Sequence, residues 1–199
     1  MVDNLWRRAL TNWPFHDRGS NLAFFLTTVC LILVGWIIYL KNKERINRRG
    51  YTGAQCFWIE MLAVYTYIVL ASTVFTREAM GFYQMEHHFL WSYRWGFEKY
   101  GKGLVEEVIL NMFLLFPIGF MFPLARPRAR WWQAGLLGVT ISLVIEVLQL
   151  FWQKGLFEYD DVFHNTLGAV AGYVLCVGIR GIARKIMRRR GCEGSSVSD

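Results

Sequence analysis

The sequence has few cysteines and few charged residues, and each shortage excludes a class of protein. Its four cysteines show no paired spacing, so they predict neither a disulfide framework nor a zinc site. Charged residues make up only 19% of the chain and hydrophobic residues 54%, which is too apolar for an ordinary soluble domain. The sequence contains no Ser-His-Asp or Cys-His pattern of the kind that indicates covalent catalysis. The first apolar block is too long for a signal-peptide core and lacks a small-residue cleavage site, so we expect it to be retained.

Basic residues outnumber acidic ones, with 22 Lys and Arg against 15 Asp and Glu. An excess of this size is also found in nucleic-acid-binding proteins, but the placement of these residues argues against that class. They flank the apolar blocks, where they anchor the topology and can contact anionic lipid. We therefore predict no nucleic-acid partner and expect membrane lipids instead.

The apolar residues fall into five blocks, each close to the roughly 20 residues that a helix needs to cross a ~30 Å hydrocarbon core. The blocks are residues 22–40, 56–75, 104–124, 131–151 and 163–179. They predict an all-α, polytopic transmembrane helix bundle with no separate soluble domain. We divide the chain into an N-terminal interfacial segment, first span and basic loop (1–55), a transmembrane core (56–182) containing an aromatic loop (80–103), and a basic and polar tail (183–199).

The basic loops predict the orientation of the bundle. Residues 41–49, 126–130 and 180–190 are basic, and five spans put all three on one side of the membrane. The positive-inside bias makes this side cytoplasmic. We therefore expect a multi-pass protein of a bacterial plasma membrane, with its N-terminus outside and its C-terminus in the cytoplasm. The arginines within the first 21 residues are the one discordant feature.

Two of the predicted spans carry a stripe of polar or small residues at intervals of three or four, which places each stripe on one helical face. On the fourth span the stripe is Ser142, Glu146, Gln149 and Gln153; on the fifth it is Asp161, Asn165, Gly168 and Gly172. A charged side chain in a bilayer costs roughly 2.5–3.5 kcal/mol on the insertion scale, so such residues usually face the bundle interior. We expect the two stripes to face each other, with the two glycines at a close helix contact.

The third span places another pair of polar residues at the same depth in the membrane. At about 1.5 Å per residue, Glu107 and Asn111 lie roughly 5 and 10 Å below the outer start of the third span, and Glu146 lies roughly 8 Å below the outer end of the fourth. The predicted ligand-binding residues at this outer level are Glu107, Asn111, Glu146, Gln149, Asp160, Asp161, Asn165 and, from the aromatic loop, Arg94. His164 is turned about 100° away from Asn165, so we leave it out.

The carboxylates of this set repel one another unless they are protonated, paired with a cation or holding a metal. Arg94 is the expected cation, and Lys154 is the alternative. Mg²⁺ or Ca²⁺ could also use such oxygen ligands, but no ligand spacing is diagnostic, and we predict no metal and no cofactor. A purely structural interpretation also stays open, in which the polar groups only hydrogen-bond between helices.

Three motifs on successive spans resemble the VanZ-like family of bacterial membrane proteins. They are Asn111-Met-Phe-Leu-Leu-Phe-Pro117-Ile-Gly119-Phe, Glu146-x2-Gln149 and Asp160-Asp161-x3-Asn165-Thr-x-Gly168. The resemblance covers about residues 66–177, and the family core has four spans, which makes the first span look like an added N-terminal helix. The family's named member is associated with reduced susceptibility to teicoplanin, a lipoglycopeptide. The resemblance therefore implies a place in the bacterial cell envelope, but no reaction.

Two functions follow as hypotheses. In the first, the protein is not an enzyme and binds an amphiphile in the outer leaflet: a lipid-linked cell-wall precursor, a polyprenyl phosphate or a lipoglycopeptide. In the second, it is a membrane enzyme acting on such a lipid, with Glu146 or Asp161 as general base and another carboxylate as acid.

Overall fold

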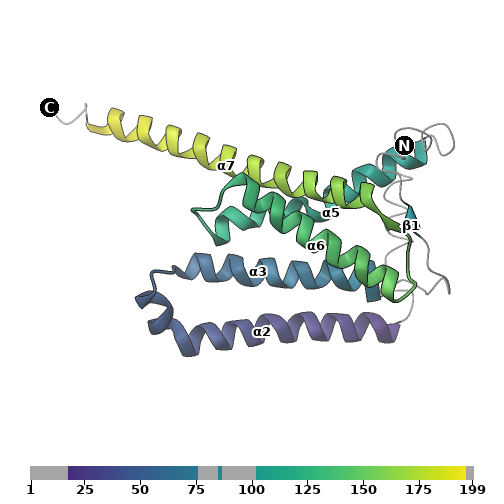
Figure 1. Cartoon of the computed structure of the whole chain (residues 1–199). Helices are drawn as coiled ribbons and strands as arrows, with labels where there is room; N and C mark the ends of the chain where they lie inside the picture. Colours follow the sequence, from purple (N-terminus) through teal and green to yellow (C-terminus); the bar gives the residue numbers. More distant parts are fainter. Residues whose placement is uncertain (1–17, 76–84, 87–101, 196–199) are drawn as a thin grey trace.

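The computed structural model describes residues 18–75, 85–86 and 102–195, in which long helices lie side by side (Figure 1). In chain order the elements are α2 (Arg18–Arg48), α3 (Gly53–Leu70), the π-helical turn η1 (Ala71–Phe75), β1 (Met85–Glu86), α5 (Lys102–Ala125), α6 (Trp131–Phe151), β2 (Phe157–Glu158) and α7 (Tyr159–Ser195). Five helices of this described part are long and apolar enough to cross a membrane. The predicted all-helical, five-span class is confirmed.

The helices extend beyond several of the predicted spans. The helix α2 continues to Arg48, so most of the first basic loop is helical. The helix α7 begins at Tyr159, four residues before the predicted start, because Asp160 and Asp161 in its first turn suit the positive end of the helix dipole. It continues to Ser195 through the basic tail, where Arg, Lys and Met are good helix formers.

Short-range hydrogen bonds define where the helices begin and end. Thr52 and Gln55 form a capping box at the start of α3, with Gln55 N–H donating to Thr52 Oγ1 at 3.2 Å and Thr52 N–H donating to Gln55 Oε1 at 2.8 Å. The last turn of α5 is capped from α7, where Arg180 Nη1 donates to the Pro123 carbonyl at 2.8 Å. The turn between α5 and α6 is thereby held against α7.

The helix α7 packs most extensively against α5 and next against α6. Glycines allow the closest approach: a Cβ built on Gly168 or Gly172 would overlap a backbone carbonyl oxygen of α5, that of Met112 or Phe116. The close contact predicted for these two glycines is confirmed, but their partner is α5.

The apolar core lies where α3, η1, α5, α6 and α7 meet, and its buried residues are Val69, Val74, Leu115, Ile118, Ile145 and Ala169. The helix α2 lies at the side of this bundle against α3 (Figure 1), and none of its apolar span is buried. A short parallel strand pair, β1 with β2, was not expected from the sequence; it aligns Met85 with Phe157 and Glu86 with Glu158.

Candidate functional site

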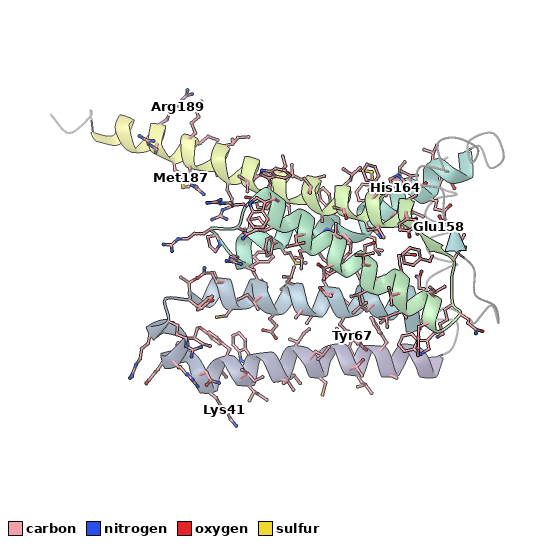
Figure 2. The ribbon with its side chains drawn as sticks, in the orientation of Figure 1. Lys41, Tyr67, Glu158, His164, Met187 and Arg189 are labelled. Carbon is pink, nitrogen blue, oxygen red and sulfur yellow. The ribbon has the colours of Figure 1, made fainter. Side chains whose placement is uncertain are left out.

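Six polar side chains are almost completely buried in α6 and α7, toward the end of the bundle where α6 ends and α7 begins. We call this end the polar end and the six residues the buried polar cluster. Each is at most 4% exposed: Ser142, Glu146, Gln149, Asp160, His164 and Asn165. Figure 2 labels His164 at this end, close to Glu158 of β2. Burying six polar groups is costly unless each finds a partner, so their partners decide what the cluster does.

Asn165 connects the two helices of the cluster. Its Nδ2 donates to Ser142 Oγ at 2.8 Å, so the polar stripe of α7 meets that of α6 at this residue. The other three residues of the α7 stripe contact α5 instead, which the sequence did not predict: Asp161, Gly168 and Gly172. Its Oδ1 is buried and has no hydrogen-bond partner among the residues that the structure describes. An unpaired buried polar atom of this kind costs about 1–3 kcal/mol.

Glu146 and Gln149 link α6 to two segments outside the α6–α7 pair. Glu146 Oε2 accepts the backbone N–H of Glu158 in β2 at 3.0 Å. Gln149 Nε2 donates to the Thr73 carbonyl in η1 at 2.9 Å. The polar stripe of α6 therefore fixes the connection to α7 on one side and the end of the α3 span on the other.

The two acidic residues at the start of α7 lie in different surroundings. Asp160 is 1% exposed, whereas Asp161 is half-buried and its Oδ1 accepts from Asn111 Nδ2 of α5 at 2.5 Å. Asn111 and Asp161, both predicted site residues, are thus brought together, at the edge of the cluster.

Sequence reasoning left out His164, which the structure buries as deeply as Asp160. His164 was left out because its direction was compared only with the helical face of Asp161 and Asn165. Because α7 already begins at Tyr159, Asp160 and His164 are separated by one helical turn and share a face. Their spacing of four residues was the signal that could have included His164.

Other predicted residues lie outside the cluster. Glu107 is exposed on α5. Gln153 does not continue the stripe of α6, because the helix ends at Phe151 and Gln153 adopts a left-handed backbone conformation with φ of 55°. Lys154 is half-buried in the following turn. Arg94 and nearly all of the aromatic loop, like most of the N-terminal interfacial segment, lie outside the described residues.

An apolar cavity of about 270 Å³ lies on the seam between α6 and α7. Its lining residues are Val139, Tyr159, Val162, Phe163 and Thr166. Tyr159 and Thr166 are the sequence neighbours of Asp160 and Asn165, but no residue of the buried polar cluster is among the lining residues. Over residues 18–75, 85–86 and 102–195, no three His, Cys, Asp or Glu side chains are grouped so that they could hold a metal ion.

No curated protein and no solved structure matches the chain. The family model described as VanZ/LLP1 matches residues 24–181. This match is wider than the motif resemblance, which covered about residues 66–177, and it includes α2, the span that had looked like an addition to the family core. The chain is a multi-span membrane protein, and it belongs to the VanZ/LLP1 family.

Proposed function

We propose that the protein binds an envelope amphiphile, with the polar head group at the buried polar cluster and an apolar chain along the seam between α6 and α7. The observation that carries this proposal is the unpaired amide atom of Asn165, in a side chain only 2% exposed. Residues that served only to hold helices together would satisfy each other, as buried polar groups nearly always do. An unpaired polar atom inside a polar cluster is suited to a ligand.

The chemistry of the cluster favours a head group rich in hydrogen-bond donors. The unpaired atom of Asn165 is an amide oxygen, which only accepts hydrogen bonds. Sugar hydroxyls and peptide N–H groups supply such donors, and both occur in lipid-linked cell-wall precursors and in lipoglycopeptides. The association of the family's named member with teicoplanin supports the same class of ligand. Arg94 is the proposed cation for a phosphate on this ligand, and the polar end is proposed to face outward.

The apolar part of the ligand has a place on the same helical seam as the cluster. The cavity of about 270 Å³ lies between α6 and α7 and is lined mainly by apolar side chains. An acyl or polyprenyl chain there would stay in contact with the bilayer while its head group reached the polar residues. This arrangement supports an amphiphile over a fully water-soluble ligand.

The burial of two carboxyl groups and an imidazole in one cluster favours a second candidate function. This is an enzyme acting on the same class of lipid, with Glu146 or Asp161 as general base and another carboxyl group as acid. The two functions share a binding site and differ in whether a carboxylate must exchange a proton with the ligand.

Native mass spectrometry of the purified protein with its co-purifying lipids tests the proposal. Asn165→Leu removes the unpaired amide, whereas the control Thr140→Val removes an exposed hydroxyl of α6 that bonds only to its own helix, at Leu136 O. We expect one lipid-linked species in wild type and control, and none in Asn165→Leu. Bulk phospholipid alone in all three proteins would contradict a ligand site.

Glu146→Gln separates the two functions, because it keeps the shape of the side chain but removes the basic oxygen. A binding protein retains the lipid in this variant. An enzyme retains the lipid and stops converting it, so the ratio of product to substrate among the bound species falls.

A further inference from the structure

A larger cavity, of about 680 Å³, lies in the seam between α2 and α3, on helices that contribute nothing to the buried polar cluster. Its walls are apolar along most of their length, and Glu60 of α3 is the only charged residue among those that line it. Glu60 lies inside the apolar span Gly53–Val74, about 10 Å along the helix from Gly53. An ionisable residue within a membrane span indicates a function until a structural partner is found for it.

The described residues provide no such partner. Glu60 Oε1 is buried and makes no hydrogen bond. A buried carboxyl oxygen without a donor is unfavourable, and more so when the group is charged. Acyl chains of bulk lipid would fill the apolar cavity but leave this oxygen unpaired. The occupant that satisfies both parts of the site must therefore bring a hydrogen-bond donor together with an apolar chain.

The carboxyl group of Glu60 lies against the backbone of α2. A Cβ built on Gly35 of α2 would lie 2.5 Å from Glu60 Oε1, so any side chain at residue 35 would displace the carboxyl group from this position. Toward the polar end, Thr27 and Tyr67 share a hydrogen bond of 2.7 Å between their hydroxyl groups. Figure 2 shows Tyr67 between α3 and α2. The α2 residues that line the cavity run from Leu31 to Ile46, roughly 22 Å of helix, which suits an extended chain.

We propose that the groove between α2 and α3 binds a membrane amphiphile whose apolar chain lies along the groove and whose ammonium or hydroxyl group donates to Glu60. The Glu60 carboxyl oxygen lacks a hydrogen-bond donor, and the ligand supplies it. This site shares no residue with the buried polar cluster, so its test does not depend on the function proposed for that cluster.

Photolabelling of the purified full-length protein in phosphatidylcholine nanodiscs tests the proposal. The probes are a photoreactive long-chain alkylamine, the alkanol and the methyl ester of equal chain length. We expect the amine or the alkanol to label groove residues such as Val34 and Ala63, and the ester to label them at least about tenfold less, because it carries no hydrogen-bond donor. Equal labelling by all three probes would overturn the proposal, since the groove would then select only for chain length.

Variants identify the role of Glu60 itself. Glu60→Leu should reduce amine and alkanol labelling about tenfold or more, whereas Glu44→Gln, which removes an exposed carboxylate that pairs with Arg48 at 3.9 Å, should leave it unchanged. Glu60→Gln keeps the shape of the side chain and removes its charge, so it distinguishes the two head groups: an ammonium ligand loses labelling in this variant and a hydroxyl ligand retains it. If Glu60→Leu does not fold, the comparison of the three probes in wild type decides the outcome. Unchanged labelling by both probes in Glu60→Leu would overturn the proposal.

Discussion

The double variant Ser142→Ala/Asn165→Leu distinguishes a cluster built for a ligand from one that only joins helices. Leu has the branching of Asn without its polar atoms, and Ala removes the hydroxyl that Asn165 contacts. The change loses one interhelical hydrogen bond, of 2.8 Å, and also removes the unpaired buried amide atom. If the cluster serves a ligand, the ligand-free protein should therefore lose little stability or gain some.

The magnitude follows from these two terms. A hydrogen bond between uncharged groups contributes about 0.5–1.5 kcal/mol to stability, whereas an unpaired buried polar atom costs about 1–3 kcal/mol. The net change therefore lies between about 0.5 kcal/mol of destabilisation and about 2.5 kcal/mol of stabilisation. If the amide were fully paired within the fold, the same change would only destabilise, by about 1–3 kcal/mol for two lost bonds.

The assay is equilibrium unfolding of the delipidated protein in detergent, compared with wild type, because a bound lipid would stabilise wild type by mass action and mask the effect. Adding back the co-purified lipid extract should stabilise wild type and leave the double variant unchanged. Destabilisation of the delipidated double variant by more than about 1 kcal/mol would contradict an unpaired amide atom, since it would mean that both polar atoms of Asn165 stabilise the fold.

Two further predictions concern the helix contacts that position the site. Gly172→Leu should lower the yield of folded protein and destabilise it by about 3 kcal/mol or more, because even a Cβ there would overlap a carbonyl oxygen of α5. The control Gly181→Ala, whose added Cβ meets nothing within 4 Å, should be neutral or slightly stabilising in thermal unfolding. Equal stability of the two variants would contradict the close packing of α7 on α5. Asn111→Leu removes a donor to the Asp161 carboxyl group and should lower the free energy of unfolding by about 1.5–3 kcal/mol in the same assay. The control Asn42→Leu, whose exposed amide bonds only to its own helix, should lower it by about 0.5 kcal/mol or less. A decrease for Asn111→Leu no larger than that of the control would show that the Asn111 contact stabilises nothing.

The spans and one side of the site could be predicted from the sequence because they depend on periodicity and length alone. An apolar block of about 20 residues has few alternatives to a membrane-spanning helix. Ser142, Glu146 and Gln149 are spaced by three and four residues, so they share a face on any helix, and the structure buries all three. The expectation that this face meets the polar face of α7 followed from the cost of exposing charges to lipid.

What the sequence did not reveal depends on helix ends and on tertiary contacts. The burial of His164 with Asp160 follows from the start of α7 at Tyr159, and helix boundaries are weakly encoded in sequence. The contact of Gly168 with α5 depends on which helix backbone comes close to it in the folded bundle, and the spacing of the glycines does not specify that helix. The contact of Glu60 with Gly35 depends on the register of α2 against α3, which neither helix specifies by itself.

The polar end of α6 and α7 is proposed to hold the head group of an amphiphile. The most direct measurement is a cryo-electron microscopy density map of the full-length protein, purified with its native lipids and bound to an antibody fragment for size. We expect an elongated non-protein density, with its head within hydrogen-bonding distance of the Asn165 amide and its chain along the cavity lined by Val162 and Phe163. A map in which a protein group donates to Asn165 Oδ1 and no such density adjoins the cluster would contradict it.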